Sequence, residues 1–380
     1  IVMGMVPLMI ILSTLYTDWG FQESFYRGMV LLVVASPCAL VASATPATLA
    51  AISHAARIGV LCKGGQALDT FAHMKAIAFD KTGTLTNGQP VVSDVAFFED
   101  IPDLPRLIVG MESQSAHPLA EAIKKFYADT EPLPMKVNEH AGVGLTADVQ
   151  DHHWQIGKEA ITADLSPQQT AQLDQLKAQG KTMIYINRDG QLVGYLALLD
   201  QPRTDAQACI RYFRKLGVHT TMLTGDHQGT AQRVAAEIGI DDYLSDCLPD
   251  EKTTAIKTLK ARYQVNAMIG DGINDAPALA TASLGIAMGE GTDVAMDVAD
   301  IVLMKNDLLR LVDCHRLALK LQRIIKQNIL FSIGVILLLI ASNFLRFLSL
   351  PLGVIGHEGS TILVILNGLR LLIPLKKEQH

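Results

Sequence analysis

The sequence predicts a membrane protein of mixed architecture, with apolar helices at both ends of the chain and an α/β region between them. Apolar residues make up 49% of the 380 residues and charged residues only 18%, which is more apolar than an ordinary soluble enzyme. The long apolar stretches come in two close pairs, one at each end. The middle of the chain instead alternates short apolar runs with helical patterns, which is typical of α/β domains.

Four apolar stretches are candidate membrane helices. They cover about residues 1–17, 25–58, 329–348 and 352–375. The last three have the roughly 20 apolar residues that a bilayer requires, and we expect the first to be cut short at its N-terminus. Arg57, Lys63 and Lys320 flank the polar middle segment, and such residues favour the cytoplasmic side. We therefore expect an integral protein of the plasma membrane, surrounded by lipid, with the large loop of about 61–326 in the cytoplasm.

Charge and cysteine usage exclude several other classes of protein. The net charge is −6 and the pI about 6.0, so the chain lacks the basic character of a nucleic-acid partner. The five cysteines are scattered, without a C-x-x-C pair or zinc-finger spacing. This pattern argues against a disulfide framework and fits a reducing compartment.

Three short apolar runs in the middle segment predict buried strands. The runs cover residues 75–80, 220–226 and 265–271. Each ends in an acidic or hydroxyl residue, and a helix is expected after the second, through Ile238. In open α/β sheets, ligands bind at the edge formed by the carboxyl ends of the strands. We therefore expect the polar residues that end these strands to lie along one edge.

The segment from about Val91 to Ala197 has a different pattern of predicted strands and helices. Residues 183–187 and 191–197 flank Arg188-Asp189-Gly190, which predicts a β-hairpin. Residues 112–127 are predicted to be helical. We interpret this segment as a separate α+β domain inserted into the first.

The most specific motif is the run Asp80-Lys-Thr-Gly-Thr-Leu-Thr86. An aspartate that ends a buried strand presents its carboxylate at the sheet edge, where it can attack a phosphorus atom. Gly83 lets the backbone turn closely around a phosphate, and Thr82 and Thr84 add hydroxyl or backbone contacts. An ordinary strand-end turn explains a bare D-x-x-G but not all seven residues. Asp80 is therefore our candidate nucleophile.

Two later motifs complete the predicted catalytic set. Thr224, Gly225 and Asp226 offer a hydroxyl and backbone amides after the second strand, and Asn274 follows the third. Lys252, in Leu-Pro-Asp-Glu-Lys, can neutralise the transferring oxygens. Each residue alone would more often be a solvated surface residue, and it is their shared position after strands that favours a site.

The same region predicts a magnesium site. Carboxylates beside a phosphate repel it unless a cation intervenes, and Mg²⁺ takes oxygen ligands from one or two carboxylates plus phosphate. We predict that Asp80, Thr82, Asp271 and Asp275 hold the ion. Asp271 is the first candidate beside Asp80, and Asp275 is either a ligand or a residue that supports one.

The motifs D-K-T-G-T-L-T, T-G-D and G-D-G-I-N-D-A-P, in this order, resemble those of the P-type ATPases. The phosphorylation domain of that family has a haloacid dehalogenase-like fold. The resemblance covers essentially the whole chain and implies that ATP converts Asp80 into an aspartyl phosphate. It also implies that Asp200 and Arg203 lie near the junction of two cytoplasmic domains. The implied division is membrane helices at 1–60 and 323–380, a phosphorylation domain at 61–92 and 197–322, and a nucleotide-binding domain at 93–196.

A nucleotide site is expected in the inserted domain. His117 can stack on or hydrogen-bond an adenine, and Glu112 can accept from its amino group. On spacing alone, His117-Pro118 is more often a helix cap, and Gly142-Val-Gly144 is more often a turn. Heavy-metal P-type ATPases carry a similar Glu, His-Pro and G-x-G set, so the resemblance favours ATP binding by these residues.

The second apolar stretch contains Ser36-Pro37-Cys38. Proline removes a backbone donor and so frees a carbonyl group inside a helix. Irregular backbone at membrane depth is tolerated where it lines a binding site, and cysteine can supply a soft thiolate ligand to a metal there. A small buried cysteine beside a structural kink is an equally good explanation of this tripeptide alone.

The fourth stretch adds His357, Glu358 and Thr361, within H-E-G-S-T. Ionisable residues at the bilayer centre cost about 2.5–3.5 kcal/mol on insertion scales, so a functional role is the default expectation. A position near the membrane surface is the alternative for His357. Asn367, further along, is expected to pair helices.

The two membrane motifs together form a ligand set of mixed softness, made up of Ser36, Cys38, His357, Glu358 and Thr361. Such a set suits zinc, cobalt, iron(II) or cadmium better than sodium, potassium or calcium. S-P-C with H-E-G-S-T resembles the subgroup described as cobalt-, zinc- or iron-exporting, whereas copper pumps carry C-P-C. One thiolate rather than two argues against copper(I) but does not select among the divalent metals.

The family needs an actuator domain with a T-G-E loop, which we do not find in this chain. We therefore expect a fragment whose partner segment lies elsewhere.

Three alternatives to the proposed activity stay open at this point. A membrane-tethered phosphatase is the first alternative, but such enzymes usually carry a second aspartate where this chain has Thr82, a poor general base. A non-enzymatic metal receptor and the same pump class with copper are the others.

Overall fold

The computed structural model describes residues 2–16, 18–115, 117–140, 144–158, 165–289 and 291–373. The chain forms two compact units, one of residues 1–73 and 310–380 and the other of residues 74–309. The predicted fold class, membrane helices together with α/β sheets, is confirmed. The domain boundaries proposed from the sequence stay predictions.

The first unit is helical. Its elements are α1 (Val2–Tyr16), α2 (Phe21–Val34), α3 (Cys38–Ala42), α4 (Thr45–Arg57), β1 (Val60–Cys62), α5 (Gly65–His73), α14 (Leu308–Phe344), α15 (Leu350–Leu369) and η3 (Arg370–Leu372). Three helical segments of the described chain are long and apolar enough to cross a membrane, namely Phe21–Arg57, Leu308–Phe344 and Leu350–Leu372. These are the three stretches predicted to qualify.

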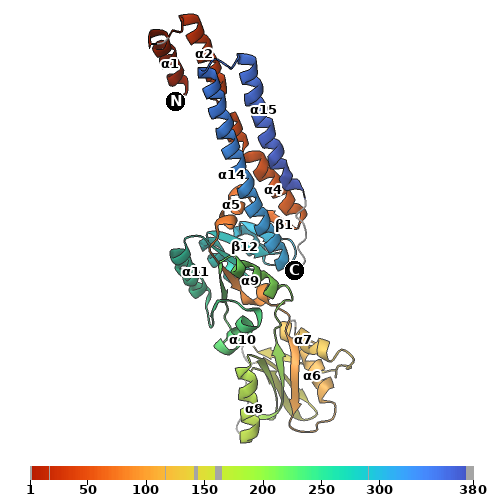
Figure 1. Ribbon diagram of the computed structural model, residues 1–380. Coiled ribbons are helices and arrows are strands. Elements are labelled where there is room, and N and C mark those ends of the chain that lie inside the picture. The colour runs from red at the N-terminus through yellow and green to blue at the C-terminus, as the bar shows by residue number, and fades with distance from the viewer. Residues whose placement is uncertain are drawn as a thin grey trace. The chain divides into compact units, whose positions relative to one another are not determined.

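Two features of the helical unit concern its long spans, of which the sequence indicated the irregular backbone at Pro37 but not the length of α14. The second span is divided into α2, α3 and α4, because Pro37 at the start of α3 and Pro46 in the first turn of α4 lack the N–H that continues a helix. The third span is part of one helix of 37 residues, α14, which starts 21 residues before the predicted stretch (Figure 1). The first half of α14 is amphipathic rather than uniformly apolar, so it lacks the long apolar run by which a membrane helix is predicted from sequence.

A parallel sheet forms the centre of the second unit. Its strands lie in the order β13-β12-β11-β2-β9-β10. Their bounds are β2 (Ala76–Asp80), β9 (His219–Leu223), β10 (Asp242–Leu244), β11 (Asn266–Gly270), β12 (Leu284–Met288) and β13 (Ile301–Leu303). The surrounding segments are η1 (Lys81–Leu85), α9 (Ala206–Lys215), α10 (Gln228–Ile238), α11 (Pro249–Tyr263), η2 (Ile273–Asp275), α12 (Ala276–Thr281) and α13 (Asp293–Val298). The three predicted strands and the helix ending at Ile238 are confirmed.

An antiparallel sheet forms the rest of the second unit, in the order β3-β8-β7-β6-β5-β4. Its elements are β3 (Val91–Phe97), α6 (Leu104–Glu112), α7 (Pro118–Phe126), β4 (Asn138–His140), β5 (Gly144–Val149), β6 (His152–Gly157), α8 (Pro167–Ala178), β7 (Thr182–Arg188) and β8 (Gln191–Leu199). The predicted hairpin is confirmed, since β7 and β8 pair around Asp189 and Gly190, which both have positive φ.

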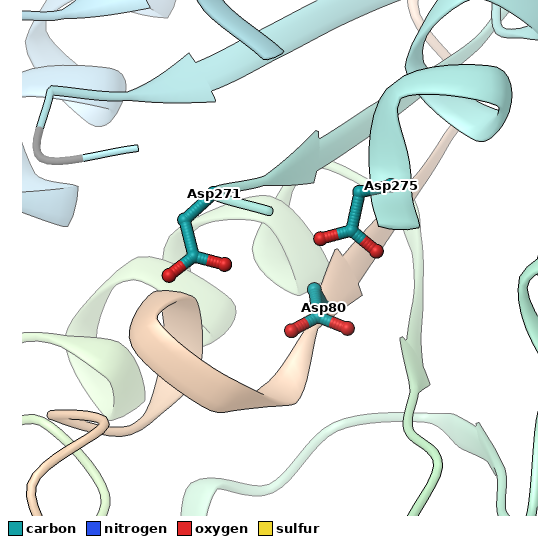
Figure 2. Close-up of side chains that lie close together, drawn as sticks. All are labelled: Asp80, Asp271 and Asp275. Carbon is teal, nitrogen blue, oxygen red and sulfur yellow. The ribbon is translucent and has the colours of Figure 1, made fainter. Parts of the chain in front are cut away.

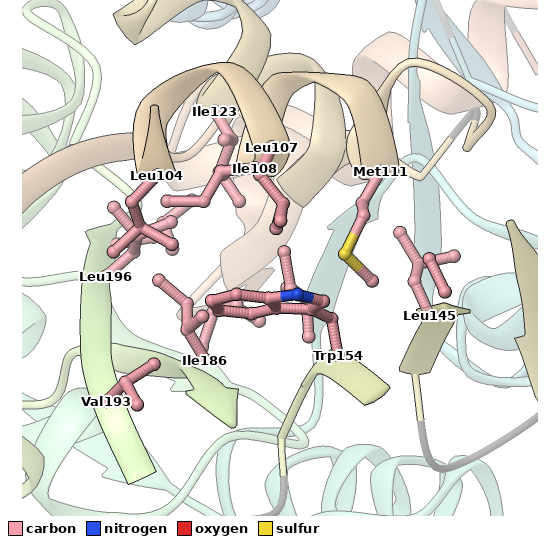
Figure 3. Close-up of a cluster of buried hydrophobic side chains, with 14 of the residues drawn as sticks. Leu104, Leu107, Ile108, Met111, Ile123, Leu145, Trp154, Ile186, Val193 and Leu196 are labelled. Carbon is pink, nitrogen blue, oxygen red and sulfur yellow. The ribbon is translucent and has the colours of Figure 1, made fainter. Parts of the chain in front are cut away.

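The two faces of the antiparallel sheet are covered by different helices (Figure 1). Trp154 and Ile186 pack with α6 and α7 on one face, as Figure 3 shows, whereas Tyr185 and Tyr195 pack with α8 on the other. This division follows from the alternation of side chains along a strand. The large core under α6 and α7 supports the segment that carries Glu112 and His117.

The prediction of one helix over residues 112–127 is wrong. α6 ends at Glu112 and α7 begins at Pro118, with His117 extended between them (φ −67°, ψ 141°). The ring of Pro118 disfavours the helical region for His117, which helps to keep α6 and α7 apart. Glu112 and His117, on either side of the break, both line one cavity.

Candidate functional site

Three carboxylates meet at the carboxyl edge of the parallel sheet. Asp80 ends β2, Asp271 follows the neighbouring strand β11, and Asp275 lies in η2. Figure 2 shows the three side chains turned toward one another. Each offers an oxygen, and these oxygens all lie within 4.8 Å of one another. Asp80 and Asp275 are buried, with only 6% and 2% of each residue exposed.

Lys252, in the first turn of α11, supplies positive charge to this cluster. Its ammonium donates to Asp80 Oδ1 and, over 2.8 Å, to Asp275 Oδ1. Burial, reinforced by the charge of Asp275, raises the pKa of Asp80 to about 7 against the opposing effect of Lys252. Burial, and again Asp275, raises the pKa of Asp271 to about 6. Burial would lower the pKa of Lys252, but the two carboxylates outweigh it and raise this pKa to about 12.

Burial is the main cause of the raised pKa values of Asp80 and Asp271, and the neighbouring charge of Asp275 adds to it. Like charges a few ångströms apart in a buried site raise each other's pKa, and an additional cation would reverse that effect. Carboxylate oxygens are the ligands that Mg²⁺ prefers. The donor set of Asp80, Asp271 and Asp275 therefore fits a divalent hard cation.

Two glycines let the motif loops approach the carboxylates. Gly83 has a φ of +70°, and a Cβ there would overlap the Asp271 carboxyl group. A Cβ on Gly270 would lie 2.7 Å from Asp275 Oδ2. Glycine is needed at both positions because the backbone itself packs against an acidic side chain.

The other predicted catalytic residues surround this cluster. Thr224 follows β9, in which Leu223 is paired with Asp80, and its buried hydroxyl accepts from the Asp226 N–H over 3.1 Å. Gly225 and Asn274 are exposed, each on a turn that follows a strand of the sheet. Thr82 is also exposed and extended (φ −74°, ψ 131°), directly after Asp80 and Lys81.

A separate cavity of about 240 Å³ lies in the antiparallel part of the second unit. It is lined by Glu112, Ser115, His117, Leu119, Ala120, Glu139, His140, Gly144, Leu145, Ile156, Gly157, Lys158 and Ile184. Burial raises the pKa of Glu112 to about 7. The positive charge of Lys124 opposes this rise, and the negative charge of Glu139 adds a smaller contribution to it. The cavity thus places a buried acid beside both apolar and cationic side chains.

The predicted nucleotide residues have structural roles as well. The ring Nδ1 of His117 accepts from the Leu119 N–H over 3.1 Å, so His117 caps α7, and Pro118 is the exposed first residue of that helix. The neutral ring must then carry its proton on Nε2. Gly144 pairs with Gly157, and a Cβ at Gly144 would lie 2.7 Å from the Gly157 Cα. Gly142 lies outside the described residues.

The predicted metal ligands of the membrane helices all lie in the helical unit. Ser36 Oγ and Cys38 Sγ are 3.0 Å apart beside Pro37, and Cys38 is exposed. In α15, His357 is 2% exposed, and its Nε2 lies 4.0 Å from Oε1 of the exposed Glu358. The hydroxyl of Thr361 donates to the His357 carbonyl over 3.2 Å.

Comparison with known proteins places these sites in a family. The family model of haloacid dehalogenase-like hydrolases matches residues 74–283, which is more than half of the chain. A zinc-transporting ATPase of Bacillus subtilis (strain 168) is 48% identical over 378 residues, 97% of this chain and 59% of that protein. A probable cadmium-transporting ATPase of Staphylococcus aureus (strain MRSA252) is 39% identical over 98% of this chain and 53% of that protein. The crystal structure of a zinc-transporting PIB-type ATPase in the E2.Pi state is 35% identical, with a TM-score of 0.88 over 98% of this chain and 62% of that chain.

The chain belongs to the haloacid dehalogenase-like hydrolases and, among them, to the P-type ATPases, and the relatives to which it is similar are named as zinc- and cadmium-transporting. It spans 59% of the length of the zinc-transporting relative. Its span-length helices and its membrane relatives make this P-type ATPase chain an integral membrane protein.

The sequence reasoning named Lys81 within its motif but gave it no role. In this P-type ATPase chain Lys81 is 4% exposed, forms an ion pair with Asp226, and lies 3.8 Å from Asp200 Oδ2. Thr86 Oγ1 donates to the same Asp200 oxygen over 2.5 Å. Lys81 therefore joins the loop after Asp80 to two other segments. The signal was available, because a lysine following a buried strand needs an acidic partner.

Three cavity residues of the P-type ATPase chain were also missed. Glu139, Gly157 and Lys158 line the same cavity as Glu112 but come from β4 and β6 or directly follow β6. Nothing in their local sequence distinguishes them, since they reach the cavity only through the pairing of β4, β5 and β6.

Proposed function

We propose that this chain is the catalytic and membrane part of a pump that uses ATP to export a divalent transition metal through a phosphorylated Asp80. The single observation that carries the proposal is the cluster of Asp80, Asp271, Asp275 and Lys252 on a chain that also has three span-length helices. The relatives' names add zinc and cadmium as transported metals of similar proteins.

In the proposed reaction, Asp80 Oδ attacks the γ-phosphorus of ATP and the β–γ bridging oxygen leaves with ADP. Lys252 stabilises the charge on the transferring oxygens, and Thr224, Gly225, Asp226 and Asn274 contact them through hydroxyl, amide and backbone groups. Asp80, Thr82, Asp271 and Asp275 would hold Mg²⁺, which would supply neutralising charge there. Thr82 cannot act as a general base, so the phosphoenzyme lasts long enough to drive a conformational change.

The cavity beside Glu112 is the proposed site of the adenine. His117, with Nε2–H free of the cap bond, stacks on or donates to the base, while Gly142 and Gly144 allow close backbone approach. These assignments make residues 93–196 a nucleotide-binding domain inserted into a phosphorylation domain of residues 61–92 and 197–322. Residues 1–60 and 323–380 form the membrane part, with the large loop on the cytoplasmic side of the plasma membrane.

The transported metal is proposed to bind Cys38, Ser36, His357, Glu358 and Thr361. Thiolate, imidazole and carboxylate together suit zinc, cobalt, iron(II) or cadmium. An actuator domain outside these residues is the proposed partner for hydrolysis of the phosphoenzyme. Metal-stimulated ATPase activity of the full-length protein, compared across zinc, cobalt, iron(II), cadmium and copper(I), ranks the metals.

The decisive test is the substitution Asp80→Asn. The full-length protein incubated with radiolabelled ATP, Mg²⁺ and zinc should acquire an acid-stable, hydroxylamine-labile label, and the variant should acquire none. Little steady label on the wild-type protein would favour a membrane-tethered phosphatase, and label that persists in the variant would exclude Asp80 as nucleophile.

A further inference from the structure

A buried hydrogen-bonded network surrounds Asn328 of α14. Asn328 is 2% exposed, and its amide nitrogen donates to the Ser43 carbonyl over 3.1 Å and to the Val364 carbonyl over 3.3 Å. Its amide oxygen accepts from Asn367 over 2.8 Å, which confirms that Asn367 pairs helices. A single side chain thereby joins α14 to α15 and to the backbone between α3 and α4.

The Ser43 carbonyl belongs to the interrupted part of the second span. Ser43 caps the C-terminus of α3 and lies five residues after Cys38, and Pro46 follows in the first turn of α4. Backbone groups at such interruptions require partners at membrane depth, because lipid offers none. Asn328 provides one, and so holds the short helix that begins at Cys38.

The hydrogen bond from Asn328 to the Val364 carbonyl lies on the same face of α15 as His357. His357, Ser360 and Val364 are all buried at helical spacing, and seven residues at a rise of 1.5 Å separate His357 from Val364 by roughly 10 Å. One turn further, a Cβ on Gly368 would lie 3.2–3.3 Å from Ala47. α15 and α4 therefore meet closely just beyond the level of Asn328.

We propose that Asn328 is a positioning residue for the transported-metal site. Its amide bonds the Ser43 carbonyl, five residues after Cys38, and the Val364 carbonyl, two turns after His357, and so sets the height of α3 against α15. The inference rests on the proposed function, since it assumes that these two segments share a metal ion. It assigns Asn328 no contact with the metal itself.

The full-length protein in lipid nanodiscs provides the test, with Asn328→Asp and Asn328→Leu. Aspartate preserves size and the acceptor for Asn367 but loses the amide donors, whereas leucine is an apolar residue that a membrane helix tolerates. Both variants should raise the Co²⁺ concentration for half-maximal phosphorylation by ATP at least tenfold and alter the absorption spectrum of bound Co²⁺. Phosphorylation by inorganic phosphate without transition metal should stay within twofold of wild type.

Asn343 offers a matched control on the same helix. It is 0% exposed, and its amide also donates to a backbone carbonyl, that of Arg27, over 3.0 Å. Asn343→Leu should lower the thermal unfolding temperature as much as Asn328→Leu does, without changing the half-saturating Co²⁺ concentration.

Four results would overturn the inference. An equal change of Co²⁺ response in the Asn343 control, or a parallel loss of both phosphorylation reactions in the Asn328 variants, would reduce Asn328 to a structural residue. Unchanged Co²⁺ response in both Asn328 variants would also refute it. A wild-type protein whose phosphorylation ignored every metal would overturn the proposed function itself, and this inference with it.

Discussion

The buried acid Glu112 makes the proposed nucleotide site sensitive to pH. Its pKa is raised to about 7 because burial disfavours the charged form. A protonated carboxyl group can donate to adenine N1 while its other oxygen accepts from the adenine amino group, whereas a carboxylate can only accept. We therefore predict that the protonated form of Glu112 binds ATP more tightly.

The size of the effect follows from that pKa. An acid with a pKa of about 7 is about nine-tenths protonated at pH 6 and about one-tenth protonated at pH 8. The carboxylate keeps one of the two hydrogen bonds, so at roughly 1 kcal/mol per bond it binds ATP about fivefold more weakly than the protonated form, and the Kd for ATP should rise about three- to fourfold between these two pH values. The Kd for ATP should rise rather than fall with pH, because raising the pH removes the proton that completes the second hydrogen bond.

Glu112→Gln supplies the matched comparison. The glutamine amide presents one donor and one acceptor at every pH, so it should bind ATP about as tightly as wild type does at pH 6. Glu112→Ala loses both hydrogen bonds and should weaken binding about 10- to 100-fold at pH 6, at roughly 1 kcal/mol per bond.

Isothermal titration with ATP from pH 6 to 8 measures these affinities. The phosphate groups of ATP also titrate in this range, but they do so equally with Glu112→Gln, so only the difference between the two proteins reports on Glu112. Affinity that rises with pH in wild type relative to Glu112→Gln, or a glutamine variant as weak as alanine, would refute the reasoning.

Two further predictions concern the phosphorylation site. Lys252→Met removes the cation shared by Asp80 and Asp275, so phosphoenzyme formation in rapid-quench measurements should slow by about 10²–10³-fold, as for the loss of a charge-stabilising donor. A rate within threefold of wild type would show that Lys252 does not contact the transferring group. Gly83→Ala forces a left-handed φ on alanine, at about 1–2 kcal/mol, and drives its methyl into the Asp271 carboxyl group. Phosphoenzyme should fall more than tenfold while ATP affinity stays unchanged, and full activity of this variant would contradict the close packing of Gly83 on Asp271.

Much of this architecture could be predicted because its signals are local. The four residues of β2 that precede Asp80 are all apolar, as expected of a strand buried on both faces. The Arg188-Asp189-Gly190 hairpin depends on two residues that tolerate positive φ. The break before α7 also has a local signal, since Pro118 disfavours the helical region for His117.

The sequence by itself determined which residues carry the chemistry and the order in which they come, because a strand, a turn and a membrane span each depend on neighbours within about twenty residues. Only the tertiary structure decided which of them meet. Parallel pairing of β2 with β11 brings Asp271 to Asp80 across nearly two hundred residues, and α11 delivers Lys252 to both Asp80 and Asp275. The pKa of Glu112, the lining of its cavity and the bonds of Asn328 likewise arise from burial and from partners distant in sequence. Charge and hydrogen bonding act through space over a few ångströms, so their consequences can be stated only once the chain is folded.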